Sequence, residues 1–197
     1  MANFWDSIPQ LLEIIRIERN PQQCFAKILE LSKQLEPSEI WECYQEMNFE
    51  RDTEAALERL KEIVTQFPDF NGICIGLDTL NWEGEGGYNV QIAMGNTCDP
   101  ASLDQEWCFD CFHYGEEHLI LSLAEVGESF TDEEKWSYEE RSAAEYIIFL
   151  CYSGIVFREA LLTLDCPNDF GTIWGFHDGD TFNLVRRIGD KRTVVAG

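Results

Sequence analysis

One segment of the chain is almost entirely apolar, and it limits the folds that the chain can adopt. Residues 143–164 carry apolar side chains at most positions, including the unbroken run 147–150. A helix that is apolar on all sides is stable in water only when other elements cover it. We therefore expect a long central helix here, with a sheet packed against it.

The spacing of apolar residues changes near residue 72 and again near residue 131. Residues 1–67 follow the helical period and predict about four helices in two hairpins. Residues 72–125 alternate in polarity, which predicts an antiparallel β-meander. Residues 131–188 return to the helical period and end in a hairpin around Asp178-Gly179. The four strands expected in the meander are 72–82, 88–94, 107–114 and 118–124.

These patterns together predict an α+β fold in a single domain spanning residues 1–197. Its parts are N-terminal helices, an acidic antiparallel β-meander, a long buried helix and a C-terminal β-hairpin. The tail, residues 189–197, shows no clear pattern and is expected to fray.

The charge of the chain is strongly negative and unevenly distributed. Asp and Glu number 37 against 14 Lys and Arg, for a net charge of −23. Residues 62–134 hold 16 of the acidic residues and neither Lys nor Arg. Contacts with phosphates and anionic lipids depend on Lys and Arg, so we expect no direct binding of nucleic acid or of a membrane surface.

The chain is expected to be cytoplasmic. No stretch of about 20 apolar residues occurs, so no transmembrane helix is predicted. The first residues lack the basic start and the apolar run of a signal peptide. The eight cysteines are therefore expected to be free thiols.

One cysteine pair has the spacing of a metal or redox motif. Cys108 and Cys111 are separated by two residues. A zinc site needs further ligands at similar spacing, and a strand over residues 107–114 would point these two side chains to opposite faces. No metal and no cofactor is therefore expected.

The chain offers few groups for catalysis, and we expect a protein that is not an enzyme. Its three histidines are His113, His118 and His177, and no nucleophile, metalloprotease or phosphate-loop motif occurs. An enzyme or small-molecule-binding domain stays open as an alternative. Its pocket would lie between the C-terminal helix and the sheet, lined by Cys111, His113, Trp174 and His177.

The acidic residues of the base-free window gather at the expected turns beside aromatic residues. This composition favours an interface for a basic protein, in which carboxylates steer the encounter and exposed aromatic side chains anchor it. The alternative is a solvated acidic surface without a partner. We expect Trp82 and Trp107 to be such anchors where they are exposed; the alternative for Trp107 is that its strand position places it in the core. The predicted partner-binding residues are Trp82, Glu83, Glu85, Asp99, Asp104, Glu106, Trp107, Glu116 and Glu117.

In composition the chain is similar to bacterial immunity proteins and to phage inhibitors that mimic nucleic acid, which are small, cytosolic, acidic and non-catalytic. The likeness is one of composition and not of motif, so it assigns no residue. Our first hypothesis is an immunity protein or inhibitor that occludes a basic target such as a nuclease toxin. A helical adaptor that acts through the N-terminal helices is a further alternative.

Overall fold

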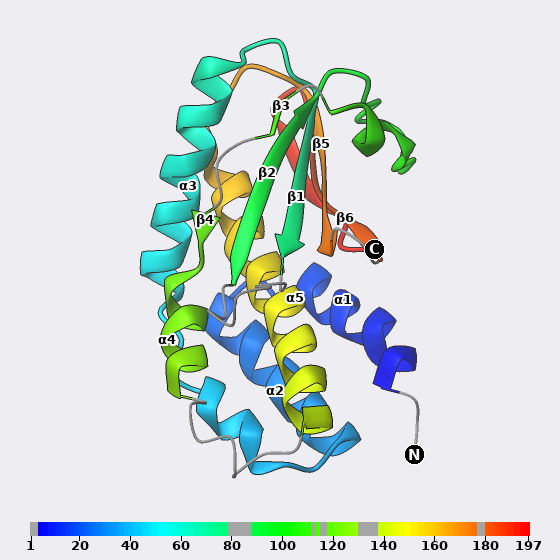
Figure 1. The fold of residues 1–197 in the computed structure, drawn as a ribbon. Coiled ribbons are helices and arrows are strands. Elements are labelled where there is room, and N and C mark those ends of the chain that lie inside the picture. Colours follow the sequence, from blue (N-terminus) through cyan, green and yellow to red (C-terminus); the bar gives the residue numbers. More distant parts are fainter. Residues whose placement is uncertain (1–3, 79–87, 112, 115–117, 130–137, 177–179) are drawn as a thin grey trace.

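The chain has an α+β fold, as the sequence predicts. The computed structural model describes residues 4–78, 88–111, 113–114, 118–129, 138–176 and 180–197. One sheet occupies the upper half of the molecule with helix α3 (Phe49–Gln66) along its side, other helices occupy the lower half, and the long helix α5 (Tyr138–Thr163) runs through both (Figure 1).

The N-terminal part is helical up to residue 66, which confirms the four predicted helical segments. Asparagines begin two of them: the side chains of Asn20 and Asn48 accept hydrogen bonds from the backbone N–H groups of Gln23 (2.9 Å) and Arg51 (3.1 Å). The elements are η1 (Phe4–Ser7), α1 (Ile8–Ile17), α2 (Pro21–Leu35), the 3₁₀ helix η2 (Glu39–Tyr44) and α3 (Phe49–Gln66).

The described strands form one mixed sheet, in the order β3-β2-β1-β5-β6-β7, with β4 also paired to β2. The predicted meander and hairpin are thus not separate, because β1 pairs in parallel with β5 while its other neighbour, β2, is antiparallel. The strands are β1 (Gly72–Asp78), β2 (Asn89–Gly95), β3 (His113–Tyr114), β4 (His118–Leu119), β5 (Phe170–Phe176), β6 (Thr181–Ile188) and β7 (Lys191–Val194).

Two predicted strands are wrong in most of their length. Residues 107–114 form the 3₁₀ helix η3 (Glu106–Asp110) and then the two-residue β3, while residues 118–124 form β4 and the start of α4 (Leu121–Ser129). Helix α4 begins where it does because the buried carboxylate of Asp52 accepts a hydrogen bond from the N–H of Ser122 (3.3 Å). A carboxylate at a helix N-terminus stabilises the helix, and this one comes from a distant part of the chain.

The C-terminal tail is also ordered by pairing, contrary to expectation. Strand β7 pairs with β6, and the backbone groups of Asn183 and Gly197 exchange two hydrogen bonds (2.9 and 3.0 Å). The predicted hairpin of β5 and β6 is confirmed, although its turn residues 177–179 lie outside the described residues.

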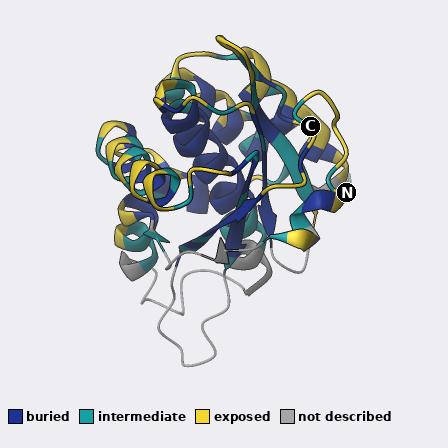
Figure 2. Cartoon of the chain, turned by 90° about the horizontal axis from the view of Figure 1, so that it is seen from above, coloured by how far each residue is buried: buried dark blue, intermediate teal, exposed yellow. Residues whose placement is uncertain are grey.

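Helix α5 is the central helix that the apolar run predicts. Residues 146–164 are buried almost throughout, and Figure 2 shows buried residues filling the centre of the molecule with exposed ones on the outer faces of peripheral helices. Ala143–Thr163 is long and apolar enough to cross a membrane, but 78% of its most apolar window is buried inside the fold. That burial is the pattern of a core helix.

The core also contains the charged side chain of Arg158. Arg158 of α5 has 0% exposure, and its guanidinium donates hydrogen bonds to the carbonyl oxygens of Ile15 (2.5 Å) and Glu18 (2.7 Å) at the end of α1. A cation at a helix C-terminus interacts favourably with the helix dipole. Arg158 therefore holds the C-terminal end of α1 against α5.

Candidate functional site

The two faces of the sheet have different roles. On β1, Ile73, Ile75 and Leu77 join the core around α5, whereas Cys74 joins a second, smaller cluster. Successive side chains of a strand point to opposite faces, so this second cluster lies on the face turned away from α5. We call it the outer face.

A row of three glycines crosses the outer face. Gly72 of β1 is paired in register with Gly95 of β2 and with Gly171 of β5. The indole of Trp107 lies directly on this row: a Cβ atom at Gly72 would be closer than 3.0 Å to three of its ring carbons. Gly72 and Gly95 leave the space that the indole fills, whereas Gly171 leaves room for the Cys98 thiol. Trp107 is 8% exposed.

Residues 96–111, which we call the covering segment, lie over this row. The segment is the green part at the upper right of Figure 1. Its anchors are three hydrogen bonds to the body of the protein: Cys98 N–H to the Asn71 side chain (2.9 Å), the Thr181 hydroxyl to the Gln105 side chain (2.8 Å), and the Asn183 side-chain amide to the Leu103 carbonyl (3.1 Å).

The covering segment presents carboxylates to solvent. Asp99, Asp104, Glu106 and Asp110 are exposed. The last three line an open hollow of about 510 Å³ together with Thr97 and Trp107. Asp99 and Asp104 also accept backbone hydrogen bonds from residues two positions on, at 3.0 Å each. These bonds fix the local turns, and no basic side chain is among the described residues that line the hollow.

The predicted partner-binding residues divide into three groups. Asp99, Asp104 and Glu106 are exposed on one segment, as an interface requires. Trp107 is buried, so the prediction that it is an exposed anchor is wrong, because the glycine row accepts its ring. Trp82, Glu83, Glu85, Glu116 and Glu117 lie outside the described residues. Asp110, which shares the hollow, is missing from the prediction because a strand over 107–114 gave it no distinct position.

Three cysteine side chains meet under the same segment. The thiols of Cys108 and Cys111 are both hydrogen-bonded to that of Cys74, and all eight cysteines of the chain are free. The prediction that Cys108 and Cys111 point apart is therefore wrong, because η3 and not a strand carries Cys108. The hydrogen bond from Cys74 lowers the pKa of Cys108 to about 7 and also lowers that of Cys111, whereas these same contacts raise the pKa of Cys74.

The pocket of the alternative hypothesis is not assembled as expected. Trp174 lies in the core on the α5 side of the sheet and donates a hydrogen bond to the Leu150 carbonyl (3.1 Å), whereas Cys111 packs in the outer-face cluster. The sheet separates the two. His177 lies outside the described residues, as does the side chain of His113.

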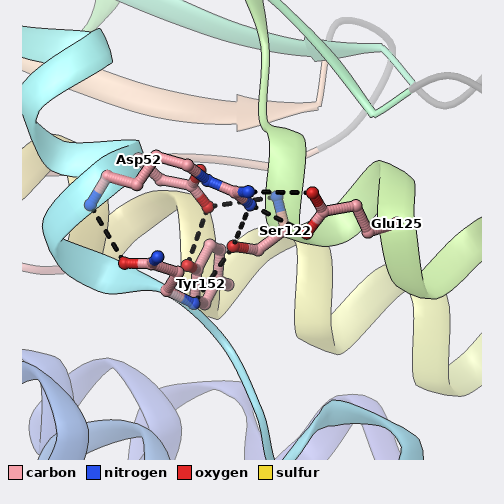
Figure 3. A network of polar contacts seen from close by, with 6 residues as sticks. Asp52, Ser122, Glu125 and Tyr152 are labelled. Carbon is pink, nitrogen blue, oxygen red and sulfur yellow. Dashed lines mark hydrogen bonds and ion pairs between the residues drawn. The ribbon is translucent and has the colours of Figure 1, made fainter.

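A buried polar network joins α3, α4 and α5 (Figure 3). Asp52, which is 2% exposed, accepts hydrogen bonds from the Tyr152 hydroxyl (2.8 Å) and, as above, from the Ser122 N–H. The Arg51 Nε atom donates a hydrogen bond to a carboxylate oxygen of Asp52 (3.3 Å). The two terminal nitrogens of the same guanidinium donate hydrogen bonds to the two carboxylate oxygens of Glu125 (2.8 and 2.9 Å). Arg51 thereby lowers the pKa of Glu125. The spacing of these five residues in the sequence gives no sign that they meet.

A second hollow, of about 480 Å³, lies on the N-terminal helices. It is bounded by α2 and by the segment that leads into α3. Its apolar lining includes Phe25, Leu29, Met47 and Phe49, and polar residues such as Gln22 and Lys33 complete it.

The comparisons with known proteins assign no family. No protein-family model matches the chain, and no curated protein or solved structure is significantly similar to it. Within the described residues, no group of three or more His, Cys, Asp or Glu side chains is arranged to hold a metal ion. The covering segment and its exposed carboxylates are therefore the strongest indication of function in this chain.

Proposed function

We propose that this protein is a non-catalytic binding protein that docks a basic protein on its covering segment. The target class is a protein with a positively charged groove, such as a nuclease toxin, and the mechanism is occlusion of that groove. The observation that carries the proposal is the hollow lined by Asp104, Glu106 and Asp110, with no basic side chain among the described residues that line it.

The carboxylates that line the hollow suit it to bind an arginine or lysine side chain. Carboxylates form their strongest hydrogen bonds with guanidinium and ammonium groups. The nearest sequence neighbours supply no cation, since residues 62–134 contain neither Lys nor Arg. A basic side chain from a partner would neutralise carboxylates that line this hollow.

The covering segment also offers an apolar contact. Leu103 is 54% exposed, although its carbonyl is held by the side-chain amide of Asn183. A fixed backbone with a projecting apolar side chain loses little conformational freedom on binding. In the proposal Leu103 takes the anchoring role that the sequence suggested for Trp107.

Reversing two charges at the hollow should slow association with the partner. Glu106→Lys with Asp110→Lys is expected to lower the association rate constant about tenfold at low salt, because steering depends on the local potential. The loss should shrink as salt rises towards 0.5 M, where screening is nearly complete over about 5 Å. The partner is first captured from a host lysate on the immobilised wild-type protein, eluted by a salt gradient and identified; binding kinetics of the pair follow.

The matched control reverses two exposed glutamates on α3. Glu54→Lys with Glu58→Lys changes the net charge by the same amount, far along the sequence from the hollow. Its association rate should fall less than threefold, and both double variants should keep the melting temperature of the wild type. Equal slowing by the two variants would reduce the effect to net charge and contradict a localised site.

The N-terminal hollow supports the second hypothesis, a helical adaptor. Its apolar lining between α2 and α3 fits an apolar side chain or a short helix of a partner. Ala26 is exposed at this hollow, so Ala26→Arg should abolish capture through it without disturbing the core. Capture that is lost in Ala26→Arg and kept in the Glu106/Asp110 variant would favour the adaptor over the inhibitor.

A further inference from the structure

Three of the four half-buried cysteines of the chain meet at one place. Cys74, Cys108 and Cys111 are partly accessible and share hydrogen bonds, while Cys43, the fourth, lies on η2. The remaining cysteines are buried. Contact between thiols brings two sulfur atoms close to the distance from which a disulfide forms with small side-chain movements.

We propose that these residues form a thiol–disulfide exchange site, in which Cys108 attacks a small disulfide and Cys74 then closes an internal Cys74–Cys108 disulfide. Cys108 takes the first step because it lies on the covering segment and is the least buried of the three thiols. Cys74 takes the second because it lies on β1 beneath the segment, packs in the same cluster and is hydrogen-bonded to Cys108.

The two steps balance with a small-molecule disulfide, RSSR, as the oxidant. The Cys108 thiolate forms a bond to one sulfur of RSSR, and the S–S bond of RSSR breaks to release a first thiolate. Cys74 then loses its proton to water and attacks the Cys108 sulfur, which expels the second thiolate. Both released thiolates take up protons from water. The protein loses two electrons and RSSR gains them.

The chemistry of the surroundings supports the order of these steps. Cys74, Cys108 and Cys111 pack against one small cluster on the outer face, so the three thiols lie within one site. The hydrogen bond from Cys74 lowers the pKa of Cys108 to about 7, which favours its thiolate, and thiolates are the attacking species.

Two acidic residues near the thiols, Asp110 and Glu106, form what we call the acidic rim, and this rim determines which disulfides react. Asp110 lies between the two cysteines of the pair in sequence, and Glu106 begins the same 3₁₀ helix. A cationic disulfide is attracted to this rim and an anionic one is repelled. The internal disulfide would also tie the covering segment to β1; its effect on partner binding rests on the proposed function, whereas the exchange itself does not.

The test treats the reduced protein with three disulfides at equal concentration: cystamine, hydroxyethyl disulfide and oxidised glutathione. Free thiols are alkylated at timed intervals, and the products are mapped by mass spectrometry. We expect a Cys74–Cys108 disulfide with each, formed at least about ten times faster with cationic cystamine than with anionic glutathione at low salt, and less than about threefold faster at high salt.

The variants separate the roles of the thiols. Cys74→Ser should stop at a stable mixed disulfide on Cys108, and Cys108→Ser should form no internal disulfide at a comparable rate. Cys43→Ser, the matched control with the same degree of burial, should behave as the wild type. Circular dichroism and the melting temperature check that each variant is folded, and Cys108→Ser keeps the test decisive if Cys74→Ser is not.

Three results would overturn the proposal. One is a mixed disulfide on Cys43 that forms as fast as that on Cys108, which would reduce the reactivity to exposure. Another is a Cys108–Cys111 disulfide as the main product, which would remove Cys74 from the mechanism. The third is one zinc ion per chain in the purified protein, lost in Cys108→Ser, because a metal-bound thiolate would not be free to exchange. None of these outcomes depends on whether a basic partner binds.

Discussion

Replacing Asp52 with alanine is expected to lower the free energy of unfolding by about 3–5 kcal/mol, because it removes the central acceptor of a buried charged network. The Tyr152 hydroxyl and the Ser122 N–H would lose their partner. Arg51 would lose one of its two carboxylates. A typical domain is stable by only about 5–15 kcal/mol, so a substantial part of its stability depends on this one side chain.

Urea denaturation measures the effect, and a double-mutant cycle shows where it arises. Tyr152→Phe removes only the hydroxyl and should cost about 1–2 kcal/mol. In the Asp52→Ala background the same change should cost much less, since the hydroxyl already lacks its acceptor. Glu54→Ala, an exposed acidic residue on the same helix, should change stability by less than about 0.5 kcal/mol. A loss below 1 kcal/mol for Asp52→Ala would show that water replaces the network.

The Asp52 network also explains why part of the fold could not be predicted from the sequence. The N-terminal helices, α5 and the β5–β6 hairpin follow from local apolar spacing and from caps such as Asn20. The change from strand to helix at Leu121 depends instead on a carboxylate about 70 residues earlier in the chain. The alternation of apolar and polar residues over 118–124 gives no indication of that contact.

The site was predictable in its charge and not in its geometry. Asp99, Asp104 and Glu106 could be named because the absence of Lys and Arg is visible in the sequence. The burial of Trp107 depends on the pairing of Gly72 with Gly95, which brings together two glycines from different parts of the chain beneath the indole. The meeting of Cys74 with the Cys-x-x-Cys pair depends on the same pairing, since it places the covering segment over β1.

Replacing Trp107 with alanine is expected to lower the free energy of unfolding by about 3–5 kcal/mol, the range measured when a large buried aromatic side chain is removed. The indole is 8% exposed and packs with Cys98 and Ile173 on the outer face. Its loss should also loosen the covering segment, which limited proteolysis would reveal as new cleavage within residues 96–111. Unchanged stability and unchanged cleavage would mean that the segment is held by its hydrogen bonds alone.

Gly72→Ala is the complementary change, because it keeps the indole of Trp107 but places a methyl group in the space that the indole occupies. The new Cβ would lie closer than 3.0 Å to three ring carbons of Trp107, and overpacking of this kind costs about 1–3 kcal/mol. In the Trp107→Ala background the same methyl group enters the space that the indole has left. The double variant should therefore be at least as stable as Trp107→Ala alone, as measured by urea denaturation. Additive losses would contradict the direct packing of Trp107 on Gly72, since independent sites add and residues in contact do not.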